Sequence, residues 1–342
     1  MRRIVGLVLM GLAGFLVMTA LLALVYVPGA LKKTPLDVDS TTRLAGNASV
    51  LPTGEASPIK ALSRTVSNGE KSDGDVVVFD TFTCLIADPE GDAPDCVDES
   101  DPDKRLVSAT QETFATNRKS AVAVNDEKYI GDGVAHDGLV NKFPFDVEQK
   151  TYPFWDGVLA HTVDANFDGV EEIDGLETYR FVTDVANESA EISSGVQGTY
   201  TSLKTMFIDP VTGSIIKQSE KQSRSLEDGT KVLDMDLTFT DETVAANVKA
   251  AKDSGSQLGL LGKLPLITGL LGLLSGIVGF LLWRGARRTE DAVDYDYDRG
   301  YADTTTDRVS DVRNDADDTS LDVFNERADG DGTVRRSDLH RH

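Results

Sequence analysis

The sequence predicts a mainly β domain, an antiparallel sandwich or open barrel, between two transmembrane α-helices. Two uncharged apolar runs predict the helices, residues 4–27 near the start of the chain and residues 264–283 near its end. Between the runs, short segments alternate polar and apolar residues and are separated by turn sequences, which is typical of antiparallel sheets. The fold class therefore rests on a change in the pattern of apolar residues. They alternate with polar residues in the middle of the chain, as in strands, and form long runs near both ends, as in membrane helices.

The apolar run at residues 264–283 is the clearer of the two spans. As a helix its length is about 30 Å, the thickness of the hydrocarbon core of a bilayer. Arg284, Arg287 and Arg288 follow directly, and such a cluster marks a cytoplasmic flank. The span also contains Gly272 and Gly276, a G-x-x-x-G pair that suits close packing between helices.

The apolar run at residues 4–27 favours an uncleaved anchor. A signal peptide has an apolar core of about 7–15 residues, and this run is longer. Arg2 and Arg3 precede it, so residues 1–3 are expected in the cytoplasm. The predicted location is the plasma membrane, crossed twice, with residues 28–262 outside the cytoplasm and both termini inside.

Composition limits the classes of partner. The formal net charge of the 342-residue chain is -23, which argues against a basic surface that binds nucleic acid. The outer segment, residues 28–262, is long enough for one substantial core or two small ones. Residues 284–342 form an acidic stretch with few apolar side chains, and we expect a disordered cytoplasmic tail.

The two cysteines, Cys84 and Cys96, bracket a turn-rich acidic loop in the outer segment. In an oxidising compartment such a pair is expected to form a disulfide. The loop-entropy model gives a bond of this span about 3 kcal/mol of stabilisation. A zinc site is the alternative, but two cysteines without a nearby histidine make a poor ligand set.

Five segments of the outer domain have the residue types and alternation of strands. They are residues 75–84, residues 106–124, a hairpin at residues 158–185, a hairpin at residues 200–223, and residues 232–240. Residues 106–124 also contain helix-compatible Ala and Gln, and strand is favoured there. Residues 28–71 are rich in Pro, Ser, Thr, Gly and Asn, and we expect one or two edge strands in this approach to the domain.

Turn chemistry separates the strands. The first hairpin is expected to turn within residues 166–175, and the second within residues 209–213, Asp-Pro-Val-Thr-Gly. In the second turn, Pro fixes φ, the Asp side chain bonds the backbone, and Gly tolerates positive φ.

After residue 240 the spacing of the apolar residues becomes that of a helix. Residues 241–254 are predicted to form a connecting helix, with Thr240 or Asp241 as its N-cap. Gly255 and Gly259 then predict a flexible join to the second span.

Residues 142–156 are the most distinctive stretch of the outer domain, because aromatic residues gather around two prolines. The prolines argue against a helix and against a central strand. A packed corner of the core is favoured, and a surface that contacts a sugar or lipid is the alternative. The candidate ligand-contact residues are Phe143, Phe145, Tyr152, Phe154 and Trp155.

No motif predicts a metal or a cofactor. Asp164, Asn166 and Asp168 match the first half of a calcium loop, D-x-N-x-D-G, but the position that needs a bidentate Glu is Gly175. A hairpin turn with solvated carboxylates is therefore favoured over a metal site. There is no G-x-S-x-G motif and no phosphate-binding glycine loop. Carboxylate catalysis stays open, with Asp146 and Asp156 as candidates.

Several stretches together resemble a known family. They include VFDTFTC, FPFDVEQKTYPFWD, GLETYRF and DPVTGSIIKQSEKQ, set between two terminal spans. The chain resembles, over most of residues 1–288, a family of membrane proteins from Actinobacteria known as DUF3068 or PorA-like porins. The resemblance implies a role in the cell envelope, linked to lipomannan maturation and lipoarabinomannan assembly. It implies no catalytic residues.

The leading hypothesis is therefore a non-enzymatic envelope protein that binds, relays or scaffolds a membrane lipid or glycolipid. Envelope-biosynthesis enzymes are the expected protein partners. Two alternatives stay open: an enzyme that modifies envelope glycans through carboxylates, and a membrane-anchored sensor that signals through its acidic tail.

Overall fold

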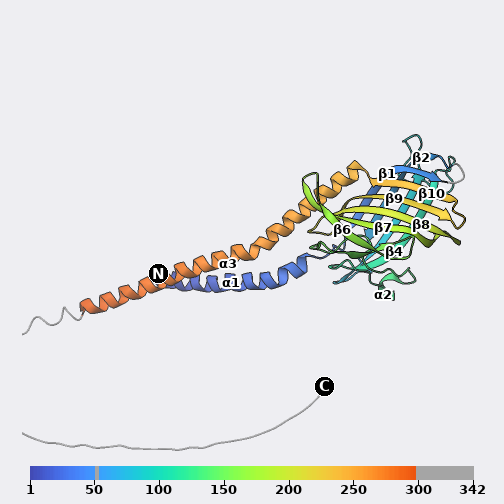
Figure 1. Cartoon of the computed structure of the whole chain (residues 1–342). Coiled ribbons are helices and arrows are strands. Elements are labelled where there is room, and N and C mark those ends of the chain that lie inside the picture. The colour runs from blue at the N-terminus through green and yellow to red at the C-terminus, as the bar shows by residue number, and fades with distance from the viewer. Residues whose placement is uncertain (51–53, 298–342) are drawn as a thin grey trace, which may run out of the picture. The chain divides into compact units, whose positions relative to one another are not determined.

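The computed structural model describes residues 1–50 and 54–297 (Figure 1). The chain divides into two units, Met1–Gly285 and Ala286–His342, and the first contains every strand. The strands are β1 (Asp39–Val50), β2 (Ala56–Ser67), β3 (Val76–Ala87), β4 (Leu106–Asn117), β5 (Tyr152–Asp156), β6 (His161–Ile173), β7 (Leu176–Ser193), β8 (Val196–Ile208), β9 (Ile215–Leu226) and β10 (Lys231–Phe239). The helices are α1 (Arg2–Leu31), α2 (Glu127–Ile130) and α3 (Asp241–Tyr297).

All ten of these strands form one antiparallel sheet, in the order β4-β3-β2-β1-β10-β9-β8-β7-β6-β5. The sheet curves into a half-barrel (Figure 1). The predicted open barrel is therefore the correct one of the two alternatives, and the sandwich is wrong because there is no second sheet to stack against the first among the described residues.

The strands predicted as edge strands lie in the middle of the sheet instead. β1 pairs with β2 on one side and with β10 on the other. Its Ser, Thr, Asn and Gly residues gave no sign of a central strand. Gly46 is part of the reason that it fits, because a Cβ there would collide with the backbone oxygen of Asp236 on β10.

The hairpin of β6 and β7 turns at the end of the stretch predicted to contain the turn, residues 166–175. β6 occupies most of that stretch, up to Ile173, and the connection is the two-residue turn Asp174-Gly175. Both residues have positive φ, 48° and 74°, as a type I′ hairpin turn requires. The register shifts between Phe167 and Gly169, so Gly169 lies at an irregularity inside the strand.

The free edges of the half-barrel are joined by short bridges. Thr116 at the end of β4 bridges to Ala123, Val122 bridges to Leu139, and Leu139 bridges to Phe154 on β5. Two short segments thus link the first and last strands of the order, at the level of these residues. Unpaired strand edges are sites of unwanted pairing, and these bridges cover part of both.

Two described helices, α1 and α3, contain stretches long and apolar enough to cross a membrane, Arg2–Tyr26 and Asp241–Gly285. α3 is continuous through the join predicted at Gly255 and Gly259, and it includes the start of the predicted tail. The rest of that tail, residues 298–342, lies outside the described residues. The predicted cap is confirmed, since Thr240 Oγ1 accepts a hydrogen bond from the Thr243 amide at 3.3 Å.

Small residues form the contact between α1 and α3. A Cβ added at Gly6 would lie 2.9 Å from the carbonyl oxygen of Gly279. A Cβ added at Gly272 would lie 3.2 Å from the carbonyl oxygen of Ala13, and one at Gly276 would lie 3.4 Å from its Cβ. The G-x-x-x-G pair therefore packs against α1 of the same chain.

Candidate functional site

The inner face of the sheet is the face that carries Ser40, Thr42, Thr65, Phe79 and Phe239. In an antiparallel sheet, residues directly opposite each other project to the same side. Ser40 lies opposite Thr65, and the pairing of β2 with β3 continues this face to Phe79. The pairing of β1 with β10 brings Phe239 to the same face. Hydroxyl groups and aromatic rings thus share a single surface.

A cavity of about 540 Å³, which we call the inner cavity, lies against this face. Its walls come from the end of α1 and the segment after it, the inner face, the aromatic stretch, the β8–β9 turn, and α3. The lining residues are Leu31, Lys33, Thr34, Pro35, Val38, Ser40, Thr42, Thr65, Phe79, Asn141, Lys142, Phe145, Thr212, Ser214, Ile215, Phe239, Asn247, Ala250, Ala251, Ser254, Gln257 and Leu258.

The β8–β9 turn fixes one wall of the inner cavity. Its backbone holds the aromatic stretch through hydrogen bonds from the Phe143 amide to the Gly213 oxygen and from the Val147 amide to the Pro210 oxygen, both 2.8 Å. Gly213 has φ 75°, and a Cβ there would collide with the Phe143 backbone. Only glycine satisfies both the backbone angle and the close approach.

The only titratable side chains among the described lining residues are those of Lys33 and Lys142. Lys142 Nζ lies 3.4 Å from Thr34 Oγ1 and 4.0 Å from the centre of the Phe145 ring. Burial lowers the pKa of the Lys142 ammonium to about 8, a shift that the charge of Asp209 opposes. Sequence reasoning missed this site, because Lys142 belongs to no motif and simply precedes the aromatic residues.

Lys33 holds the rim of the inner cavity to the sheet. Its Nζ lies 3.0 Å from Asp75 Oδ1 and donates to the Gly74 oxygen at 2.6 Å. Next to it, Lys32 pairs with Asp146 at 2.6 Å. These contacts tie the segment after α1, which contributes to the cavity wall, to two different parts of the half-barrel.

The predicted ligand-contact residues divide between the core and the cavity. Phe143, Tyr152 and Phe154 are buried in one cluster with residues such as Phe181. Phe145 lines the inner cavity. Trp155 is half-buried, with its ring 4.7 Å from that of His136. The structure thus brings one of the five to the cavity, and ligand contact by the others stays a prediction.

The two candidate catalytic carboxylates already have partners. Asp146 is exposed and paired with Lys32. Asp156 is buried, and its Oδ1 accepts hydrogen bonds from the amides of Val158 and Leu159 at 2.9 and 3.1 Å. Its Oδ2 accepts from the Tyr200 hydroxyl at 3.1 Å. Asp156 therefore caps the turn after β5.

A second group of charges on the inner face is paired within itself. Lys204 Nζ lies 3.4 Å from Glu220 Oε2, and both side chains are at least four-fifths buried. Burial acts to lower the pKa of Lys204, but the negative charges of Glu220 and Asp156 outweigh it, and the pKa is raised. Gln222 donates to Glu220 at 3.1 Å and to Tyr200 at 3.3 Å.

The weak metal candidates are spread along β6. Asp168 pairs with Arg180 at 2.9 Å, and Asn166 Oδ1 accepts from the Thr151 hydroxyl at 2.8 Å. In a strand, residues two apart lie on the same face but about 7 Å apart along it, so the spacing that brings Asp164, Asn166 and Asp168 to one ion in a calcium loop separates them along β6. Among the described residues there is no cluster of three metal-binding side chains.

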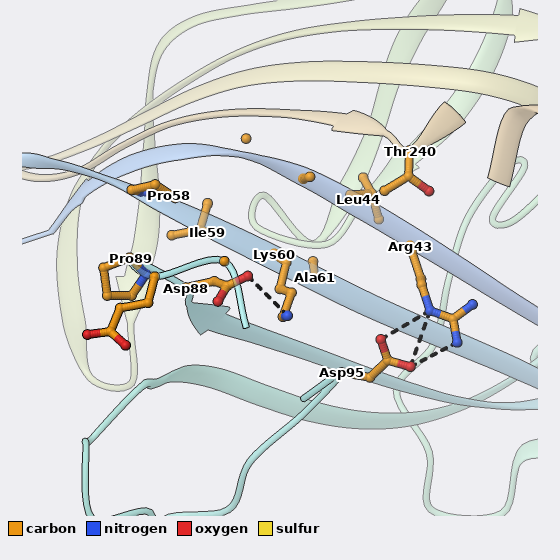
Figure 2. A pocket seen from close by; sticks show the side chains of 14 residues that line it. Arg43, Leu44, Pro58, Ile59, Lys60, Ala61, Asp88, Pro89, Asp95 and Thr240 are labelled. Carbon is orange, nitrogen blue, oxygen red and sulfur yellow. Dashed lines mark hydrogen bonds and ion pairs between the residues drawn. The ribbon is translucent and has the colours of Figure 1, made fainter. Parts of the chain in front are cut away.

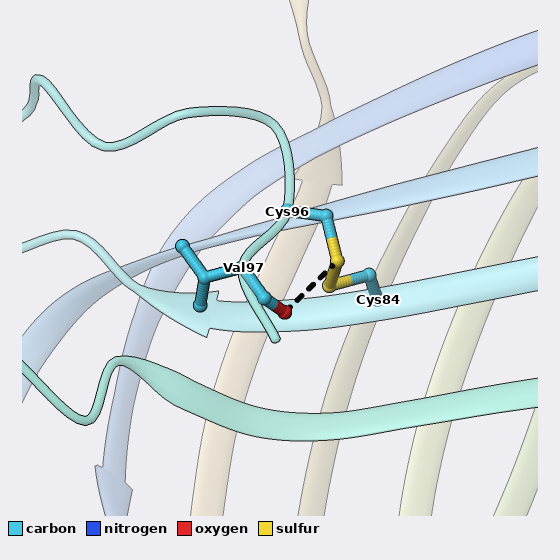
Figure 3. Close-up of a disulfide and its surroundings, with 3 residues drawn as sticks. All are labelled: Cys84, Cys96 and Val97. Atoms are coloured by element: carbon cyan, nitrogen blue, oxygen red, sulfur yellow. Dashed lines mark hydrogen bonds between the residues drawn. A yellow bond between two sulfur atoms is a disulfide. The ribbon is translucent and has the colours of Figure 1, made fainter. Parts of the chain in front are cut away.

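A second hollow of about 370 Å³, which we call the outer pocket, lies beside the loop after β3 (Figure 2). The predicted disulfide between Cys84 and Cys96 is confirmed and anchors this loop to β3 (Figure 3). Two ion pairs cross the pocket: Arg43 Nη2 with Asp95 Oδ2 at 2.8 Å, and Lys60 Nζ with Asp88 Oδ2 at 3.0 Å (Figure 2).

Comparison with known proteins gives one broad match. The family model described as Porin PorA matches residues 5–281. No curated protein matches the chain. Among solved structures, a domain described as an outer membrane lipoprotein-sorting protein of Vibrio parahaemolyticus is 9% identical, with 61% of this chain and 86% of that chain covered and a TM-score of 0.17. At that score the likeness carries no argument about the fold.

Proposed function

We propose, starting from the fact that this chain belongs to the Porin PorA family, that it is a non-enzymatic binding protein of the cell envelope. Its ligand is one amphiphilic lipid or glycolipid molecule, held in the inner cavity. The matched residues include nearly all of α1, the whole sheet and most of the apolar part of α3, so anchors and binding domain belong to one family unit.

The position of the inner cavity carries this proposal. Leu31, on its wall, lies four residues beyond the first predicted span, residues 4–27. Leu258, also on its wall, lies six residues before the second, residues 264–283, which is about 9 Å of helix. If both spans cross the bilayer, the cavity sits at the membrane surface, where a lipid enters without crossing water.

The lining suits an amphiphile. Phe79, Ile215 and Phe239 offer apolar surface, and Ser40 and Thr42 offer hydroxyl groups on the same wall. Ligand sites in proteins typically have volumes of about 300–1,000 Å³ and mix apolar walls with a few polar groups. The inner cavity, at about 540 Å³, is within this range.

We infer that this half-barrel is not a membrane pore, although the family is described as a porin. A membrane-spanning barrel closes on itself and presents an apolar band to the lipid. Here the sheet is open along most of its edges. Residues such as Arg43 and Arg64, on the opposite side from the inner face, carry charge.

The proposed topology places both termini in the cytoplasm and the half-barrel outside. The arginines at residues 2, 3, 284, 287 and 288 support this orientation. Tethering at both ends keeps the cavity beside the bilayer, where lipoglycan precursors of the lipomannan type emerge. From this position the protein would relay such a lipid to envelope enzymes or hold those enzymes together as a scaffold. The occupied carboxylates of Asp146 and Asp156 favour binding over catalysis.

The test is lipid occupancy of the full-length chain. The chain is purified in mild detergent, and the lipids retained per molecule are identified and counted by mass spectrometry. Thr42→Trp fills the inner cavity, and Thr41→Trp, on the exposed opposite side of β1, is its matched control. We expect a stoichiometric lipid in the wild type and in Thr41→Trp and none in Thr42→Trp. Equal occupancy in both variants, or an empty wild-type chain, contradicts the proposal.

A further inference from the structure

We propose that the ligand of the inner cavity is anionic, and that Lys142 pairs with its phosphate or carboxylate group. This inference rests on the proposed function and names the class of its ligand.

The charge of the inner cavity is opposite to that of the chain. The sequence contains 57 Asp and Glu residues against 34 Lys and Arg. Even so, the described lining contains Lys33 and Lys142 and no Asp or Glu. The outer pocket, by contrast, has Asp88, Glu90 and Asp95 in its wall. A site that excludes carboxylates in so acidic a chain is suited to hold a negative charge.

Lys142 lacks a counter-ion. Lys33 pairs with Asp75, whereas Lys142 forms no ion pair with any residue that the structure describes. Its nearest partners are the Thr34 hydroxyl at 3.4 Å and the Phe145 ring at 4.0 Å, both in the cavity wall. A buried charge is normally paired, because transfer out of water is costly. The missing partner is the one that a ligand supplies.

A second polar group in the wall is also without a partner. Asn141 Oδ1 is buried and accepts no hydrogen bond from the described residues, and Asn141 lines the same cavity. A buried acceptor with no donor is rare in folded proteins. A ligand headgroup with an acidic group and a neighbouring hydroxyl satisfies both residues, since Lys142 donates to the acid and Asn141 accepts from the hydroxyl.

The walls favour an amphiphile over a free anion. Phe145 lies against Lys142, and Phe79, Ile215 and Phe239 line the same space. Inorganic phosphate leaves these apolar surfaces in contact with water, whereas an acyl chain covers them. The anionic group and the apolar chain of one lipid therefore fit two different parts of the wall.

The charge of Lys142 makes the affinity sensitive to pH. The pKa of its ammonium in the empty site is about 8. The charged groups around it are Lys33, from the segment after α1, and Asp209, from the β8–β9 turn. The inner face and α3 contribute no titratable side chain to the described wall. Affinity for an anion is therefore highest below pH 8 and falls as the pH rises above it.

The experiment measures binding to the full-length chain in non-ionic detergent, by calorimetry. The probes are dioctanoyl phosphatidic acid, laurate, the neutral dioctanoylglycerol, and inorganic phosphate alone. The variants are Lys142→Met, Lys142→Arg and Lys217→Met. Lys217 is a matched control, because it also lies over an aromatic ring, Phe207 at 5.6 Å, but outside the cavity.

We expect an anionic probe to bind the wild type at least tenfold more tightly than dioctanoylglycerol, the effect of one charge-assisted hydrogen bond. Lys142→Met loses this preference, and Lys217→Met keeps it. Lys142→Arg also keeps the preference. Its affinity for the anionic probe does not fall between pH 7 and pH 9.5, because arginine stays charged. Whichever of phosphatidic acid and laurate binds more tightly identifies the acidic group as a phosphate or a carboxylate.

Other results overturn the inference. Equal binding of the anionic and neutral lipids rejects the anionic ligand but leaves the proposed function standing. Binding of no lipid at all rejects both. Inorganic phosphate that binds as tightly as phosphatidic acid rejects the lipid and indicates a free-anion site. If Lys142→Met does not fold, the pH profiles of the wild type and of Lys142→Arg decide, since two identical profiles reject the role of Lys142.

Discussion

The inner cavity and the outer pocket differ in how their charges are satisfied. In the outer pocket, Arg43 and Lys60 each have a carboxylate within 3.0 Å (Figure 2), and a disulfide anchors the loop beside them (Figure 3). In the inner cavity, Lys142 forms no ion pair with a described residue, and Asn141 Oδ1 has no donor among them.

This difference separates a structural joint from a binding site. Groups that satisfy one another stabilise the fold and offer a ligand little, because binding must first break their contacts. Groups left unsatisfied reduce stability until a ligand supplies the partner. Loss of charge should therefore reduce stability at the outer pocket and increase it at the inner cavity. Four predictions test this comparison, in decreasing order of expected effect.

The largest effect is expected in the wall of the inner cavity, from Gly213→Ala. A Cβ at Gly213 collides with the Phe143 backbone, so overpacking adds to the strain of positive φ. We expect a loss of about 4 kcal/mol in the free energy of unfolding, measured by urea denaturation in detergent. Gly229→Ala is the matched control, since its φ is 85° with open space around it, and should cost about 1 kcal/mol. Equal losses of unfolding free energy in the two variants would show that the turn rearranges to accommodate the added Cβ.

The next effect concerns the loop beside the outer pocket. Replacement of both Cys84 and Cys96 by Ala frees the loop in the unfolded chain and should cost about 3 kcal/mol. Proteolysis of residues 88–105 should become faster. The lipid content of the purified chain should not change, because the loop does not line the inner cavity. A loss of bound lipid would show that the two hollows are coupled.

Lys142→Met tests the opposite sign of effect at the inner cavity. Burial lowers the pKa of this lysine to about 8, so the empty folded chain carries a penalty at neutral pH of about 3 kcal/mol. The variant should be more stable than the wild type by that amount at pH 7. Between pH 8 and 10.5 the unfolded state binds more protons than the folded state, so wild-type stability rises and the difference closes. A variant less stable than the ligand-free wild type at pH 7 would contradict this.

The smallest effect is expected for Asp95→Asn. The pair with Arg43 is about half exposed, and exposed ion pairs contribute less than about 1 kcal/mol. The Arg43 hydrogen bonds hold the pKa of Asp95 below its usual value. This stabilisation is therefore present above pH 4 and is lost as the pH falls through the lowered pKa. Acid unfolding curves of the variant and the wild type should converge at low pH, and a gap that widens would reject the pairing.

Sequence reasoning succeeded where the determinant is local. Residues 75–84 form most of β3, and the Asp-Pro-Val-Thr-Gly turn connects β8 and β9 as expected. The Thr240 cap and the disulfide were also predictable, because caps, turns and short loops depend on a few neighbouring residues. The turn between β6 and β7 was predicted too widely, over residues 166–175, because D-x-N-x-D-G resembles a loop; the turn itself is Asp174-Gly175, which has the type I′ signal.

The inner cavity was largely out of reach of sequence reasoning. Of the predicted contact residues, the structure places Phe145 in its wall. Lys142 and Asn141 were missed because neither belongs to a motif. Their importance comes from what surrounds them: Thr34 is more than 100 residues from Lys142 along the chain and lies against it in space. Burial and missing partners are properties of the assembled wall.

The sequence by itself determined the two apolar helices, most of the strands and the covalent closure of the loop after β3. These depend on composition, alternation and short-range geometry. The tertiary structure decided that β1 lies in the middle of one curved sheet, that α3 is continuous, and that segments far apart in the chain line one cavity, whose described lining contains two lysines and no carboxylate. Pairing between distant strands sets these features, and the energy of such pairing depends on all the partners together.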